Sequence, residues 1–400
     1  MDAKLQELIH AVEPLVKKHR REIHAHPELG MQEEKTAVLV QRELARIGVP
    51  FTANVGKLGV VGLINGEKPG PCIALRADMD ALPIQETTGL PFASTVPGIS
   101  HACGHDTHTA MLLGAAEVLW NIRHDLPGSV KLLFQPAEEM NPTGGMPFMI
   151  EDGILLNPTL DAAMALHVSS DIPTGSVGYR PGAMSASSNR FYITIKGKAA
   201  HGSAPDAGID AIVTAAQIIL GIQTIVSRKI KALDSAVLSI GVIKGGDRYN
   251  VIPETVSLEG TCRTHNPQVT AMIPLLMEQI IKGICDSAGC TYDFRFDNGY
   301  PAVVSDARIT ALVKDELVDM MGEERVIYIP TPRMGGEDFA FLAEKVPSTF
   351  IRIGCTAEGV THPAPAHNGA FDPDEDCFVV GVKAYVAAAM SVLRDLSSQQ

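Results

Sequence analysis

The chain has 400 residues, of which 46% are hydrophobic and 20% are charged, so it can bury a large core and is long enough for two domains or more. Its net charge is −13 and its Lys and Arg residues form no long basic block, which excludes nucleic acid and anionic membranes as expected partners. Seven scattered cysteines without a CxxC spacing predict no disulfide framework and a reducing, cytoplasmic location.

The N-terminal segment predicts an amphipathic helix and lacks the basic start and apolar run of a signal peptide. The longest apolar stretches of the chain are too short and too often interrupted to predict a membrane span.

From about Thr36 to Val168, helical and extended patterns alternate. The alternation predicts an α/β domain around a mostly parallel sheet, with ligands expected where the strands end. The predicted helices are residues 33–48 and 108–126, and the predicted strands are 72–80, 129–139 and 160–168.

After Gly182 the pattern changes to a β-α-β-β-α-β order, which is typical of a ferredoxin-like unit with an antiparallel sheet. From about Ala302 the first pattern resumes and ends in a helix that starts near Asp374. We therefore expect residues 1–184 and 300–400 to form one α/β domain, interrupted by a smaller α+β domain at 185–299.

The stretch "HACGHDTHTA" at residues 101–110 combines a thiol, imidazoles and a carboxylate. Cys103 and His105 precede a predicted helix, on a loop free to wrap an ion, and their side chains are ligands that transition metals prefer. Taken alone, the stretch is also typical of a polar turn in which Asp106 caps the helix.

Two carboxylate pairs stand where predicted strands end. Asp78 and Asp80 alternate onto one face, where they can orient ligands or accept hydrogen bonds from metal-bound histidines. Glu138 and Glu139 are adjacent, so their side chains diverge; one can bind metal while the other faces a water. Each pair alone is also typical of a turn or of a solvated acidic loop.

Histidines complete the candidate set. His167 ends the predicted strand 160–168, although a lone histidine there is more often a core residue. His367 lies in a loop rich in Pro and Gly, where His362 is a competing candidate. Because all these sites emerge where strands or loops of the same α/β domain end, together they predict metal-assisted hydrolysis.

Other polar residues are candidates for substrate binding. His201 and Asn250 stand in turns of the inserted domain, where they suit a lid that reaches a substrate carbonyl or carboxylate, or are simple turn residues. Arg263 and Arg352 are borne on strands and can pair with a carboxylate. The acids of "MGGEDFAFL" are interpreted as caps of a helix.

Seven motifs appear in a fixed order across nearly the whole chain: "RADMDALPIQE", "HACGHDTHTAMLLGAA", "FQPAEE", "AAHGSAPDAGIDAI", "NVIPETVSLEGTCR", "GGEDFAF" and "AHNGAFD". In this order the chain resembles the amidohydrolase branch of the aminoacylase and carboxypeptidase metallopeptidase superfamily. That branch includes hippurate hydrolases, N-acyl-L-amino acid amidohydrolases and auxin-conjugate hydrolases.

The resemblance implies a site for two divalent transition-metal ions, with zinc, manganese, nickel and cobalt as candidates. It implies that Glu138 is the general base that activates the water and that Asp80 orients the site. The residues that match the family's metal ligands are Cys103, His105, Glu139, His167 and His367.

The resemblance also implies that His201 stabilises the oxyanion and that Asn250 lies near the substrate. The inserted domain matches a lid and dimerisation domain, so a homodimer or higher homo-oligomer is expected. The implied substrate is a small N-acyl amino acid of the hippurate or N-acetyl-amino acid type.

Two stretches depart from the family pattern: "MNPTGGMPFMIEDG" after Glu139, and "SSDIPTG", where the family has a proline and bulky residues after His167. They leave the acyl group and the amino acid open. A dipeptidase or aminopeptidase acting on free N-termini is the alternative activity, and a non-catalytic binding module is a further alternative.

Overall fold

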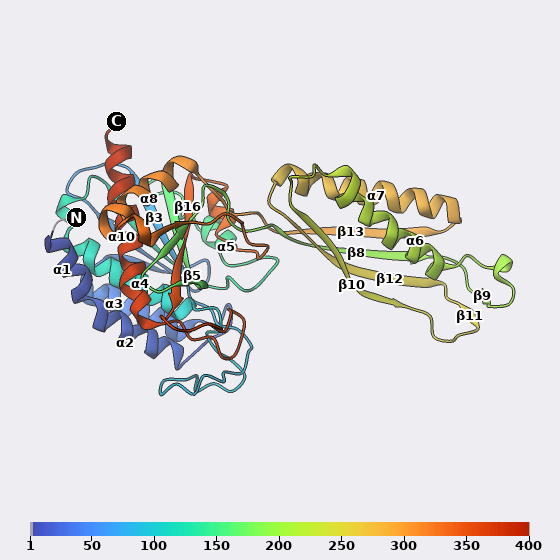
Figure 1. Ribbon diagram of the computed structural model, residues 1–400, viewed down its shortest axis with the longest axis horizontal. Coiled ribbons are helices and arrows are strands. Elements are labelled where there is room, and N and C mark those ends of the chain that lie inside the picture. Colours follow the sequence, from blue (N-terminus) through green and yellow to red (C-terminus); the bar gives the residue numbers. More distant parts are fainter. Residues whose placement is uncertain (1–2, 400) are drawn as a thin grey trace. The chain divides into compact units, whose positions relative to one another are not determined.

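The structure is a computed structural model that describes residues 3–399, and it contains two compact units (Figure 1). The first unit comprises the chain up to Gly182, Val304–Thr331 and the chain from Asp338. The second comprises Ala183–Val303 and Pro332–Glu337. The short return at 332–337 was not part of the division expected from the sequence.

An eight-stranded sheet forms the centre of the first unit. Its four central strands run parallel, and antiparallel pairing occurs toward both edges. The expectation of a large, mostly parallel α/β sheet is therefore confirmed. In spatial order the strands are β1 (Phe51–Val55), β2 (Gly59–Asn65), β4 (Ser129–Gln135), β3 (Cys72–Asp78), β5 (Ala162–Pro173), β16 (Ser348–Thr356), β6 (Val177–Tyr179) and β15 (Val326–Tyr328).

Helices cover this sheet. The helices of the first unit are α1 (Ala3–Ala11), α2 (Glu13–His24), α3 (Glu34–Ile47), α4 (His105–Asn121), α5 (Met146–Glu151), α8 (Ala307–Met321), α9 (Ala340–Ala343) and α10 (Phe378–Ser397). All seven residues of β3 are buried, as expected for a strand with both faces covered. Ile73, Leu75 and Ala77 join the hydrophobic core formed with α4 and α10. Because strand side chains alternate, Arg76 and Asp78 point to the opposite face.

The second unit has the β-α-β-β-α-β order expected from the sequence. Alternate residues of its sheet, such as Phe191, Ile193 and Ile195, pack with both helices into a second core, and the helices lie on one face of the sheet (Figure 1). The elements in chain order are β8 (Ser188–Lys196), β9 (Ala200–His201), α6 (Ala211–Thr224), β10 (Ala236–Gly245), β11 (Val251–Ile252), β12 (Thr255–Thr264), α7 (Pro267–Ala288) and β13 (Thr291–Tyr300). The antiparallel sheet has the order β10-β12-β8-β13.

Two helical segments, Ala211–Lys229 and Glu375–Ser397, reach the length and hydropathy that a membrane span requires. The second is 83% buried within the protein, and both supply residues to the hydrophobic cores of their own units. Core helices commonly meet the same criterion, so these helices are weak evidence for a membrane span. All seven cysteines are buried, and none is in a disulfide in this structure.

Candidate metal centre

Side chains with metal-ligating atoms gather where the parallel strands of the first unit lead into loops. Glu138 and Glu139 follow β4, and His167 lies on β5. Cys103 lies in the loop before α4, whose first residue is His105. His367 comes from the loop between β16 and α10.

These side chains form overlapping groups whose potential ligand atoms lie within 4.8 Å of one another. The groups are Cys103 with His105 and His167, Cys103 with Glu139 and His367, and His105 with Glu138 and Glu139. Cys103 Sγ lies 3.3 Å from His167 Nε2, and Glu139 Oε1 lies 3.0 Å from His367 Nε2. The competing candidate His362 is exposed and belongs to none of the groups found among the described residues.

In His105 and His167, hydrogen bonds determine which ring nitrogen can bind a metal ion. His105 Nδ1 lies 3.1 Å from Asp80 Oδ1, and His167 Nδ1 lies 2.7 Å from the carbonyl oxygen of Val168. Both oxygens only accept, so each Nδ1 donates, and in the neutral imidazole Nε2 is the nitrogen that offers a lone pair to a metal ion. His105 Nε2 is buried without a hydrogen-bond partner among residues 3–399, as expected of a nitrogen that faces an ion.

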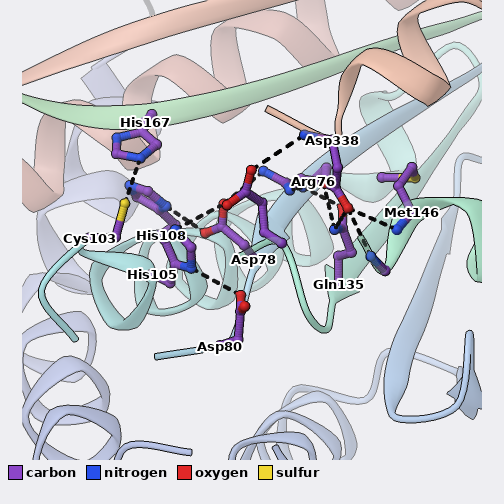
Figure 2. A network of polar contacts seen from close by, with 12 residues as sticks. Arg76, Asp78, Asp80, Cys103, His105, His108, Gln135, Met146, His167 and Asp338 are labelled. Atoms are coloured by element: carbon purple, nitrogen blue, oxygen red, sulfur yellow. Dashed lines mark hydrogen bonds and ion pairs between the residues drawn. The ribbon is translucent and has the colours of Figure 1, made fainter. Parts of the chain in front are cut away.

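Asp80 holds the site at two points. Its Oδ1 accepts from His105, and its Oδ2 accepts from the backbone N–H of Glu139 at 2.9 Å. Figure 2 shows this carboxylate beneath the ring of His105. The orientation of His105 and the position of Glu139 are thus tied to one side chain at the end of β3.

A buried charged network, which the sequence analysis did not identify, continues from the cluster. Asp78 lies between His108 and Arg76, 2.6 Å from His108 Nδ1 and 2.7 Å from Arg76 Nη1 (Figure 2). The backbone N–H of Val168 donates to His108 Nε2. His108 therefore fixes the position of β5 next to His167. The available sequence signal was a charged residue, Arg76, within an otherwise apolar strand, because a buried charge requires a partner.

The interpretation of the acids in "GGEDFAF" as helix caps is wrong for Asp338. Its carboxylate accepts from Arg76, from Gln135 and from the backbone N–H groups of Gly145 and Met146 (Figure 2). The predicted helix at 337–346 is reduced to the four-residue α9, which has no side-chain cap. The backbone N–H of Asp338 donates to Glu138 Oε1 at 3.4 Å, which connects this network to the carboxylate pair.

Two residues of the site have left-handed backbones. Ala137 has φ +57° and His367 has φ +65°, a conformation that costs a residue with a Cβ atom about 1–2 kcal/mol. The N–H of His367 donates to the carbonyl oxygen of Ala102, and that of Ala137 donates to the carboxylate of Glu33. Such strain persists where surrounding contacts enforce it, and it is concentrated at functional sites.

Burial and neighbouring charges shift the pKa values of His167 and Asp78 in this cluster. Burial lowers the pKa of His167 well below its usual value, and the nearby positive charge of Arg352 adds to the effect. This keeps the imidazole neutral, which is the form that binds metal. Burial opposes the ionisation of Asp78, but the neighbouring imidazoles of His105 and His108 and the guanidinium of Arg76 hold its pKa well below the ordinary range.

Of the residues predicted to bind substrate, Arg352 lies beside the cluster, because it is the neighbour of His167 in the register of β16 and β5. His201 and Asn250 belong to the second unit, where the N–H of Gly202 donates to the carbonyl oxygen of Asn250. His201 is exposed on β9. Arg263 is half-buried on β12, where burial and the charge of Arg190 lower its pKa.

Residues 74–391 of the chain match Peptidase family M20/M25/M40. A Bacillus subtilis protein named N-acetyl-L-cysteine deacetylase is 40% identical over 90% of this chain and 84% of its own length. A Geobacillus stearothermophilus protein named N-acyl-L-amino acid amidohydrolase is 42% identical over 75% of this chain and 80% of its own length.

A solved structure gives the same result. The crystal structure of the Bacillus subtilis YXEP protein, described as a dinuclear metal binding peptidase from the M20 family, superposes with a TM-score of 0.84. It is 35% identical in sequence, and the alignment covers 96% of this chain and 99% of that one.

Proposed function

Because the chain belongs to peptidase family M20/M25/M40 and is a hydrolase of amide bonds, we propose that it cleaves the acyl–nitrogen bond of N-acyl amino acids. The observation that carries the proposal is the grouping of Cys103, His105, Glu139, His167 and His367 next to Glu138. Relatives named for N-acetyl-cysteine, N-acyl-amino acid and IAA-amino acid substrates support the substrate class.

The residues of the cluster fit a pair of divalent transition-metal ions, as in the relative described as dinuclear. The fit rests on the Nε2 of buried His105, which accepts no hydrogen bond and donates none within residues 3–399, and on a donor set of thiol, imidazole and carboxylate. That donor set favours transition metals over magnesium or calcium. When bound, such ions polarise the amide carbonyl and lower the pKa of water to about 7. Zinc, manganese, nickel and cobalt all suit this set.

Glu138 is the proposed general base. Its carboxylate takes a proton from the attacking water and delivers it to the leaving nitrogen of the amide. The backbone N–H of Asp338 holds Glu138 Oε1, and only 7% of the Glu138 residue is exposed. Asp80 fixes His105 and Glu139 during this proton transfer, so the base keeps its position relative to the ligands.

The roles of the remaining residues are part of the proposal. His201 donates a hydrogen bond to the oxyanion, and Asn250 contacts the substrate near the scissile amide. Arg263 and Arg352 are proposed to bind the substrate carboxylate. The second unit is proposed to act as a lid and as the contact surface of a homodimer in the cytoplasm.

The test is hydrolysis of an acyl panel by metal-stripped protein, before and after manganese, zinc, nickel or cobalt is added. The panel contains hippurate, N-acetyl-methionine and N-acetyl-cysteine, with free dipeptides as controls. If an added metal restores hydrolysis of the N-acyl substrates but not of the dipeptides, the result supports the proposal. Cleavage of dipeptides alone supports the peptidase alternative, and a complete lack of turnover supports a binding module.

A further inference from the structure

Glu33 is a buried carboxyl group that the metal cluster does not contain. It has no exposed surface, and its Oε1 accepts a hydrogen bond of 2.7 Å from the backbone N–H of Ala137. Its Oε2 is also buried and has no hydrogen-bond partner in the described part of the chain. The residue lies outside the segment that matches the family, which begins at residue 74.

The side chain of Glu33 is not needed for the helix that follows it. Glu33 stands at the N-terminal cap position of α3 but makes no side-chain cap bond. Glu28 serves that end instead, because its carboxylate accepts from the N–H groups of Lys35 and Thr36. The carboxyl group of Glu33 instead accepts a hydrogen bond from the loop that follows β4, and the backbone N–H groups of Met31 and of Glu33 itself also favour its ionised form.

That loop is held by two carboxyl groups from different parts of the chain. Glu33 binds the N–H of Ala137, and Asp80 binds the N–H of Glu139. Ala137 has a left-handed backbone and directly precedes Glu138 and Glu139 in the chain. The hydrogen bond from Ala137 is thus a contact that can keep this backbone in a disfavoured conformation.

We propose that Glu33 is a positioning residue of the hydrolytic site: by holding Ala137, it sets the angle at which Glu138 and Glu139 face the ions and the water. The inference rests on the roles proposed for these two glutamates. Burial and the negative charge of Asp80 raise the pKa of Glu33 to about 7. A protonated Glu33 still accepts through Oε1, so the contact persists in either ionisation state.

The test compares Glu33→Gln, which keeps an acceptor oxygen, with Glu33→Met, which has similar length but no comparable acceptor. The same replacement at an exposed neighbour, Glu34→Met, is the matched control. We expect Glu33→Met to lower kcat at least about tenfold with KM within about twofold, because the lost contact acts on the transition state. Glu33→Gln should retain kcat within about threefold, and Glu34→Met should match the wild type.

Metal affinity provides a second readout. Manganese or zinc is titrated into metal-free protein by calorimetry, and Glu33→Met should weaken binding by about 10–100-fold because Glu139 is displaced. Wild-type kcat and metal affinity in Glu33→Met would overturn the inference, and so would equal losses in the Gln and Met variants. If the wild type cleaves no substrate, the proposed function fails, and the metal titration still decides the role of Glu33.

A third variant covers the case in which Glu33→Met does not fold. Glu33→Asp keeps the carboxyl group but withdraws its oxygens from Ala137 by one methylene. The inference requires the neutral Gln variant to have the higher kcat and the tighter metal binding of the two. A Glu33→Asp variant that equals or exceeds Glu33→Gln would contradict it.

Discussion

Replacing Glu33 by Gln should increase the free energy of unfolding by an amount that grows with pH. The pKa of Glu33 is raised from 4.5 to about 7 by burial and by the charge of Asp80. The folded state therefore binds the proton more tightly than the unfolded state does. Below about pH 4.5 the carboxyl group of Glu33 is protonated in both states and does not lower the free energy of unfolding. As the pH rises from about 4.5 through about 7, the wild-type protein loses free energy of unfolding because of this group.

The magnitude follows from the two pKa values. Each pH unit between them corresponds to about 1.4 kcal/mol, so the ionised carboxylate costs the folded state about 3 kcal/mol at pH 8. Glutamine has similar size and no charge, so it avoids this cost. The difference between variant and wild type should therefore grow by about 3 kcal/mol between pH 4.5 and pH 8, with most of the rise below pH 7.

The single tryptophan of the chain makes the assay specific. Trp120 lies on α4 in the first unit, which also contains Glu33, so its fluorescence reports the unfolding of that unit. Urea unfolding of both proteins is followed at about pH 5, 6, 7 and 8 under identical metal conditions. A free-energy difference that is constant across this range would refute the assignment of a buried, protonated Glu33.

Three further substitutions test the site. Glu138→Ala should lower kcat for amide hydrolysis by about 10²–10⁴-fold while metal content, measured by elemental analysis, stays near that of the wild type; retained turnover would exclude Glu138 as the base. His201→Ala should lower kcat by about 10²-fold with unchanged metal content, and steady-state kinetics showing only a rise in KM would argue against an oxyanion role. Arg76→Met leaves the buried carboxylates of Asp78 and Asp338 without their shared cation, so urea unfolding should show a loss of about 3–5 kcal/mol, and a loss below about 1 kcal/mol would contradict the network.

Much of the site's composition could be predicted from short stretches of sequence. A thiol two residues from an imidazole, adjacent glutamates after a strand and a histidine on an apolar strand are local patterns that metal chemistry explains. The alternation of helix and strand predicted the two-part organisation for the same reason, since periodicity is a local property. The hairpin formed by β1 and β2 was not predicted, and neither was the reduction of residues 337–346 to the short α9.

The sequence by itself determined which residues can carry the chemistry and the order in which the chain presents them. Only the tertiary structure decided how they are held. Asp338 lies 262 residues from Arg76 and Glu33 lies 104 residues from Ala137, yet each pair is in direct contact. No local pattern encodes these pairs, because they form only where the order of strands in the sheet brings distant loops together. A separate contact selects the ring nitrogen that His105 offers: its Nδ1 meets the carboxylate of Asp80, 25 residues away in the chain, which leaves Nε2 for a metal ion.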